Sequence, residues 1–159
     1  MLQISRLLLL AGASANQSTN VMKNSSVLGV ASYLGFLDFI NLLLHHGADP
    51  NKTNNDGDTP LIQAAAEGHT TTVETLVKNG ANVAIRNALE ETALVTAAAH
   101  GHLNIVSFLL KCKWPKTMLQ KQAQQALVTA ARNGHAQVSS PYTVFLENCH
   151  GFTPSINEG

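Results

Sequence analysis

The sequence predicts an all-α solenoid, in which one helical unit is repeated and stacked along an axis. The first observation is an alanine-rich heptapeptide at 64–70, whose alanines followed by Gly-His return at 97–103 and 130–136. The second is that the glycines of these heptapeptides are evenly spaced, at Gly68, Gly101 and Gly134. The third is a set of leucines with the same spacing, at Leu28, Leu61, Leu94 and Leu127. A fixed period in the range of about 20–50 residues is typical of a stacked supersecondary unit, so we expect the function to lie on a surface.

The first helix of the unit is predicted at 60–67. Asp56-Gly57 is a turn signal, and the hydroxyl of Thr59 can cap the helix that follows. Pro60 suits the first helical position, because the N–H that proline lacks would have no partner there. The segment before the helix is therefore expected to be a turn at the tip of a loop.

A second helix is predicted from about 70 to 79, after Gly68 breaks the first. Apolar residues recur at helical spacing, as Val73, Leu76 and Val77. Gly80 is expected to end this helix in the left-handed conformation, which glycine adopts without strain. The unit is therefore helix, turn, helix and an extended finger loop.

These motifs resemble the ankyrin repeat. Residues 56–61 stand where that family has its turn and Thr-Pro-Leu signature, Gly68-His69 at its inter-helix turn, and 80–83 at its exit. The resemblance implies an ankyrin-repeat solenoid of helix-turn-helix units with extended finger loops. Ile62 replaces the signature histidine, so the usual imidazole hydrogen bond to a neighbouring loop cannot form there.

A narrower resemblance concerns the third repeat and the helix after it. The exit at 111–114 lacks the glycine, and the next helix opens with the Gln-rich segment 122–127. Both features resemble the ankyrin region of the TANC and rolling-pebbles scaffold proteins. That resemblance implies a scaffold that assembles at a membrane-proximal signalling site, such as a synapse.

The missing glycine of this exit predicts a rebuilt loop. Lys113 stands at the glycine position, and a lysine in the left-handed region would be strained by roughly 1–2 kcal/mol. Pro115 is expected to close the preceding helix, and the next helix to begin early, near Thr117, in place of the hairpin arm. Trp114 is expected to be a core plug over this loop; the alternative is an exposed anchor.

Composition agrees with one domain that binds neither nucleic acid nor membranes. The 159 residues are 45% hydrophobic, and ten basic residues balance ten acidic ones, which leaves no electrostatic footprint for an anionic partner. No segment reaches the roughly 18–20 apolar residues that span a bilayer. Cys112 and Cys149, the only cysteines, are expected to be reduced thiols in a cytoplasmic protein.

The register divides the chain into three parts. A partial repeat is expected at 1–24, with only a second helix and a finger, then ankyrin repeats at 25–135, and a truncated repeat with an irregular tail at 136–159. Pro141 is expected to interrupt the last helix. Both terminal units are therefore expected to lack some of the neighbouring helices that would bury their apolar faces.

The N-terminal leucines also resemble a secretory signal, because Arg6 precedes an apolar run and a small-x-small site. The register favours a helix instead, since it places Leu8 on Leu43. The three sequons, at Asn16, Asn24 and Asn51, then have no role, because glycosylation requires secretion.

The candidate binding surface is the strip that faces the concave side in the ankyrin family. It comprises residues just before the inter-helix glycines and acidic residues of the finger tips: Tyr33, Leu34, Asp56, Asp58, Ala66, Glu67, Glu91, Ala99, His100 and Arg132. A protein partner with a basic segment and an apolar anchor is expected to fit, with the anchor near Tyr33 and Leu34. For any single residue the alternative is a merely solvated side chain.

No residue pattern indicates catalysis, a cofactor or a metal. His69, His102 and His135 occupy one repeat position, at the start of each second helix, which is typical of a structural turn-cap residue, and no acidic or cysteine ligand recurs with them. The sequence has no nucleophile elbow, zincin motif or phosphate-binding loop.

The favoured function is therefore non-catalytic protein binding within a cytosolic scaffold. Two alternatives stay open. One is a partial gene product without independent function, and the other is the regulatory fragment of an ankyrin-bearing enzyme.

Overall fold

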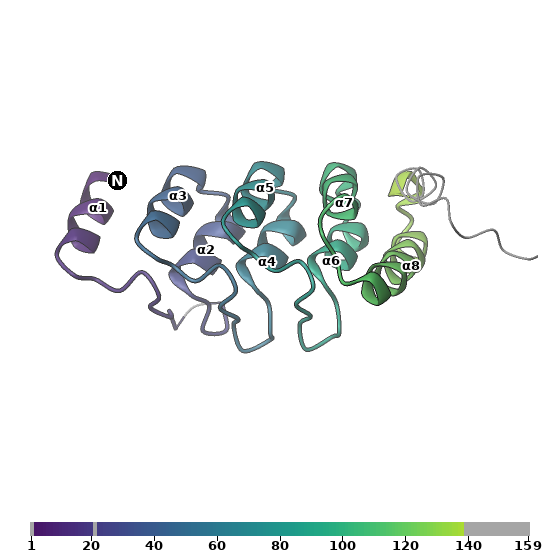
Figure 1. Ribbon diagram of the computed structural model, residues 1–159, viewed down its shortest axis with the longest axis horizontal. Helices are drawn as coiled ribbons and strands as arrows, with labels where there is room; N and C mark the ends of the chain where they lie inside the picture. Colours follow the sequence, from purple (N-terminus) through teal and green to yellow (C-terminus); the bar gives the residue numbers. More distant parts are fainter. Residues whose placement is uncertain (1, 21, 139–159) are drawn as a thin grey trace, which may run out of the picture.

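The computed structural model describes residues 2–20 and 22–138, which form eight α-helices in two rows (Figure 1). The outer row is α1 (Leu2–Leu10), α3 (Leu37–His45), α5 (Thr70–Lys78) and α7 (Leu103–Leu110). The inner row is α2 (Val27–Leu34), α4 (Pro60–Glu67), α6 (Ala93–Ala99) and α8 (Lys116–Arg132), and a 3-10 turn, η1, covers Ala136–Val138. Finger loops project from one side of the rows (Figure 1). The predicted all-α solenoid is confirmed.

The inner helix α4 begins where the sequence predicts. The hydroxyl of Thr59 accepts the N–H of Ile62 at 3.2 Å, and Pro60 is the first residue of α4. The hydroxyl of Ser26 caps α2 in the same way, at 3.0 Å from the N–H of Gly29. These caps fix the first turn of each helix at the base of a finger loop.

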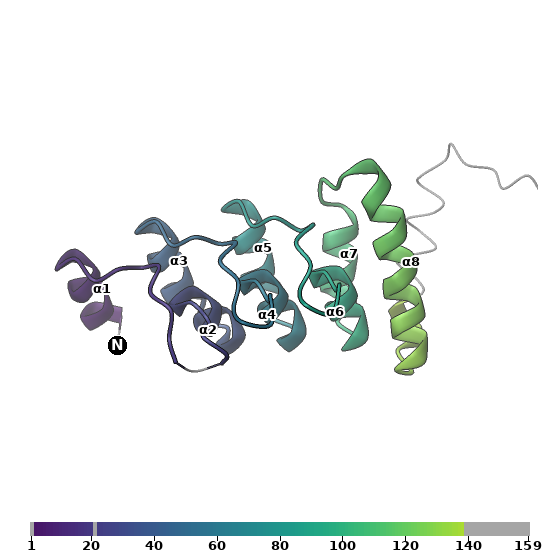
Figure 2. The same cartoon turned by 90° about the horizontal axis from the view of Figure 1, so that it is seen from below.

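Two glycines end the helices of the second repeat in the left-handed conformation. Gly68, after α4, has a φ of 79°, and Gly80, after α5, has a φ of 90°. Both values confirm the predicted breaks, and α5 ends one residue earlier than predicted, with Asn79 as its cap. The chain can therefore reverse between the rows and then leave each helix pair as a finger loop (Figure 2).

The core is a ridge of aliphatic side chains between successive repeats. Leu28, Leu61 and Leu94 are at most 1% exposed. Leu127 differs from the prediction, because it is only half-buried. The helix α8 packs against α6, and no helix pair of the described chain stacks beyond it. The buried residues of α8 are Gln122, Ala123, Ala126 and Ala130.

The third exit is rebuilt, as its missing glycine predicts. Lys113 is absent from the residues with positive φ in the described chain, and α8 begins at Lys116 in place of a finger arm. The prediction for Pro115 is wrong in one respect: α7 already ends at Leu110, and Pro115 precedes α8. Trp114 is half-buried against the core and its Nε1 donates to the carbonyl of Leu109 at 2.8 Å, which agrees with the plug.

The helix α1 takes the outer-row position that the register predicts, beside α3. Leu7, Leu8 and Leu10 of this helix remain exposed, with Leu8 57% exposed, whereas Leu43 at the equivalent position of α3 is 1% exposed. The difference arises because α2 covers Leu43, while no inner helix of the described residues covers Leu8. The tail and its expected break at Pro141, together with Cys149, lie outside the described residues.

Candidate protein-binding groove

Histidines tie the second and third repeats to the repeat before each. The Nε2 of His69 donates to the carbonyl of Tyr33, and that of His102 donates to the carbonyl of Ala66, both at 2.9 Å. Neither side chain caps its own helix. The predicted turn-cap role is therefore wrong for His69 and His102. Their side chains instead link repeats, and they fix the backbone of two residues of the predicted surface.

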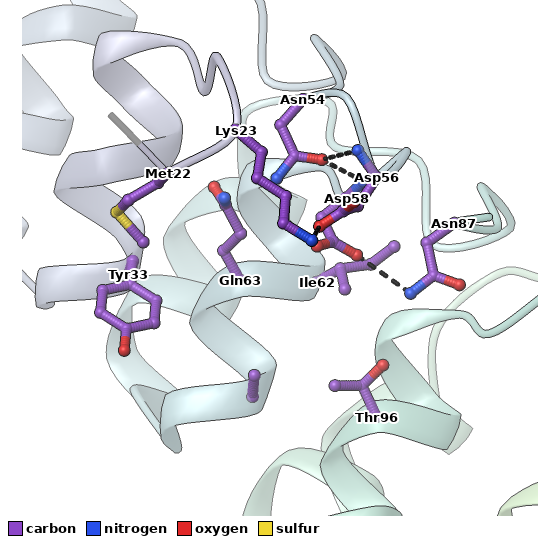
Figure 3. Close-up of a pocket in the computed structure, with 11 residues that line it drawn as sticks. Met22, Lys23, Tyr33, Asn54, Asp56, Asp58, Ile62, Gln63, Asn87 and Thr96 are labelled. Carbon is purple, nitrogen blue, oxygen red and sulfur yellow. Dashed lines mark hydrogen bonds and ion pairs between the residues drawn. The ribbon is translucent and has the colours of Figure 1, made fainter. Parts of the chain in front are cut away.

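A groove of about 350 Å³ opens between the finger loops and the inner helices (Figure 3). It contains four of the residues that the sequence places on the binding surface: Tyr33, Asp56, Asp58 and Ala66. It is also lined by residues that the sequence reasoning missed: Met22, Lys23, Asn54, Ile62, Gln63, Asn87 and Thr96. Asn54 and Asn87 occupy one position in successive repeats, and this equivalence is the signal that could have found two of them.

These two asparagines hold the finger tips in shape. The Oδ1 of Asn54 accepts the N–H groups of Asp56 and Asp58, at 3.0 and 2.9 Å. Asn87 repeats this arrangement in the next finger, and its Nδ2 donates to the Oδ1 of Asp58 at 3.0 Å. The carboxylate of Asp58 is thereby positioned at the groove by the neighbouring finger.

The acidic patch expected at the finger tips is partly neutralised within the chain. The Nζ of Lys23 lies 2.6 Å from the Oδ2 of Asp56, and Arg86 forms an ion pair with Glu90. A hydrogen bond with Asp56 raises the pKa of Lys23, with smaller contributions from the charges of Asp56 and Asp58. The groove therefore holds two carboxylates and one ammonium group.

Comparison with known proteins identifies the repeats. A family model described as ankyrin repeats in three copies matches residues 1–87 and 85–140. The chain belongs to the ankyrin repeat family. Ankyrin repeats are protein–protein interaction modules.

Curated relatives share only part of their length with this ankyrin chain. Ankyrin repeat domain-containing protein 63 of Mus musculus is 38% identical over 72 residues, 45% of this chain and 18% of that protein. The Homo sapiens protein of that name is 36% identical over the same length. Dynein axonemal heavy chain 12 of Bos taurus is 39% identical over 69 residues, 43% of this chain and 19% of that protein. The chain thus spans under a fifth of these relatives.

The other predicted surface residues lie outside the lining of the groove. They are Leu34, Glu67, Glu91, Ala99, His100 and Arg132. The carbonyl of Ala99 accepts a hydrogen bond from Asn133 at 2.8 Å, and the ring of His100 stacks on His102 with centroids 6.2 Å apart. These two therefore contribute to the ankyrin stack itself, and their part in binding stays a prediction.

Two features of the described residues bear on other classes of function. No three His, Cys, Asp or Glu side chains among them are grouped so that they could hold a metal ion. No helix in 2–20 or 22–138 is long and apolar enough to cross a bilayer.

Proposed function

We propose that this ankyrin chain is a non-catalytic binding module that holds a segment of a partner protein in the groove. The observation that carries the proposal is the meeting of Tyr33, Asp56, Asp58 and Ala66 around one hollow (Figure 3). Tyr33 is 37% exposed, and Leu34, its neighbour in the chain, is 48% exposed. An apolar or aromatic anchor of the partner would dock there, where burial of apolar surface contributes most.

The carboxylates of the groove favour a partner with a basic segment. Asp56 and Asp58 lie on the finger, across the groove from the inner helix α2 that carries Tyr33. A cationic side chain next to an apolar anchor would meet both features in one extended segment. Charge pairs of this kind contribute to association rate and specificity more than to affinity.

The wider setting that we propose is a cytosolic scaffold. The features of 111–114 and 122–127 that resemble the TANC and rolling-pebbles proteins support it, and they suggest a membrane-proximal signalling site. The remaining predicted residues, from Leu34 to Arg132, would extend the contact along the concave side.

Affinity capture with paired variants tests this function. Ala66→Arg fills the groove, while Thr71→Arg adds the same side chain on the exposed side of the outer helix α5. We expect Ala66→Arg to lose partners that the wild type and Thr71→Arg retain. Identical partners for all three proteins would contradict binding in the groove.

A further inference from the structure

Lys23 places a positive charge on the acidic side of the groove. Its Nζ contacts the Oδ2 of Asp56 at 2.6 Å, and Figure 3 shows the side chain reaching from the first finger across to Asp56 and Asp58 on the second. The chain itself therefore supplies the kind of cation that a basic partner would bring.

The backbone around Lys23 is held by contacts that do not involve its ammonium group. Its carbonyl accepts the N–H of Asn55 at 2.9 Å. The hydroxyl of Ser25 donates to the carbonyl of Met22 at 3.0 Å and accepts from the Nε2 of Gln63 at 2.7 Å. The side chain of Lys23 can therefore leave Asp56 while the loop stays docked on the second repeat.

The backbone conformation of this loop determines where the side chain of Lys23 begins. Met22, Lys23 and Asn24 all have positive φ, at 51°, 56° and 64°, which non-glycine residues rarely adopt. This conformation turns the loop toward the second finger. The ion pair that results is open to water, because the Lys23 side chain is 66% exposed and that of Asp56 is 42% exposed. Exposed pairs contribute little to stability, so this one can exchange with a competing cation.

We infer that Lys23 is a specificity-determining residue that competes, from within the chain, with the basic residue of a partner segment. The inference rests on the proposed function. A partner with a single lysine has to displace an equal charge, whereas an arginine can bind a carboxylate through two parallel hydrogen bonds. The groove therefore favours arginine-containing segments and discriminates against weakly basic ones.

Fluorescence anisotropy with a defined probe tests this competition. The probe is a short fluorescein-labelled peptide that carries arginines and one tryptophan among glycines and serines, with a glutamine-for-arginine peptide as its control. Lys23→Met removes the competitor, and Lys23→Arg restores a cation that can pair with Asp56. Lys78→Met removes the same charge from the outer helix α5, where the Lys78 side chain is 73% exposed and lies 3.9 Å from Glu74.

We expect Lys23→Met to bind the arginine peptide about threefold to tenfold more tightly than the wild type at low ionic strength. Lys78→Met should bind as the wild type does, and Lys23→Arg should bind no more tightly than the wild type, because an arginine competes for Asp56 at least as well as the lysine does. The glutamine peptide should show no gain. Equal or weaker binding by Lys23→Met would overturn the competition while leaving the groove function intact. Failure of every variant to bind the arginine peptide would overturn the basic-segment proposal, and the competition with it.

Discussion

One buried hydroxyl of the outer row has no partner. Thr72 is 1% exposed on α5, and its Oγ1 makes no hydrogen bond within the described residues. The equivalent positions of α3 and α7 carry the apolar residues Phe39 and Ile105. An apolar side chain therefore suits this position of the repeat better than a hydroxyl does. The unpaired hydroxyl of Thr72 lowers the stability of the fold without preventing it from forming.

Replacing this hydroxyl by a methyl group should stabilise the protein. We expect Thr72→Val to raise the free energy of unfolding by about 1 kcal/mol, because it removes an unsatisfied buried group and keeps the shape. Thr71→Val, on the exposed side of the same helix, should change it by less than about 0.5 kcal/mol. Urea denaturation followed by circular dichroism measures both. A loss of stability in Thr72→Val would show that the hydroxyl has a partner.

Substitutions at two left-handed glycines distinguish the effect of backbone strain on stability from the effect of packing between repeats. A Cβ on Gly68 would lie 2.6 Å from the ring of His102, whereas a Cβ on Gly80 would meet nothing within 4 Å. Gly80→Ala should cost about 1–2 kcal/mol of unfolding free energy through strain alone. Gly68→Ala should cost about 1 kcal/mol more, because His102 must also give up its hydrogen bond to Ala66.

The comparison of the two glycine variants has its own control. In the presence of His102→Ala, the extra cost of Gly68→Ala should disappear, since the ring is gone. Thermal or urea unfolding of the four combinations gives the coupling. Equal costs for Gly68→Ala and Gly80→Ala in the wild type would contradict the link between repeats.

At the scale of elements, asparagines clamp the first two fingers to the next repeat. The Nδ2 of Asn51 donates to the carbonyl of Gly80 at 3.2 Å, and its Oδ1 accepts the N–H of Asn82 at 2.7 Å. Asn16 makes the same pair of bonds to Gly47 and Asp49, at 3.0 and 2.6 Å. Both are sequon residues, and in this fold their amides hold the finger loops.

The third finger has lost both halves of this clamp. Ala84 stands one repeat after Asn51 and has no side-chain amide, while Pro115 stands one repeat after Asn82 and has no N–H. The loss coincides with the exit at Lys113 and the early start of α8. The rebuilt loop and the missing clamp are thus one structural change.

Removing the clamp from the second finger should weaken the attachment of that finger to the next repeat. We expect Asn51→Ala to lower the free energy of unfolding by about 1 kcal/mol and to speed amide exchange at Asn82. Asn55→Ala, at an exposed position of the same finger, is the control and should change neither. Unchanged exchange at Asn82 in the first variant would contradict the clamp.

The elements differ in how far the sequence could predict them. Thr59, Pro60 and Gly68 define α4 by local chemistry, so its bounds follow from the sequence alone. The early start of α8 follows from the absent glycine. The reach of Lys23 to Asp56 could not be predicted, because no glycine marks its left-handed turn and the contact joins two fingers. The sequence predicts a concave strip that contains four residues of the groove, but it does not predict the groove itself.

At the scale of the whole molecule, burial depends on neighbours along the stack. Leu8 and Leu43 hold the same position in α1 and α3, yet they are 57% and 1% exposed. Leu43→Ala should cost about 2–5 kcal/mol of unfolding free energy, because it leaves a cavity between helices. Leu8→Ala should cost less than about 1 kcal/mol. Similar losses in urea unfolding would show that α1 is covered in solution.

We propose that the stack of ankyrin repeats presents its binding surface where the first two fingers meet the inner helices. Amide chemical-shift mapping with the arginine and tryptophan peptide tests it most directly. We expect chemical-shift changes at the amides of Tyr33, Asp56 and Ala66, and unchanged amide shifts on the exposed side of α5. Shifts confined to the outer row, or to the leucines of α1, would contradict it.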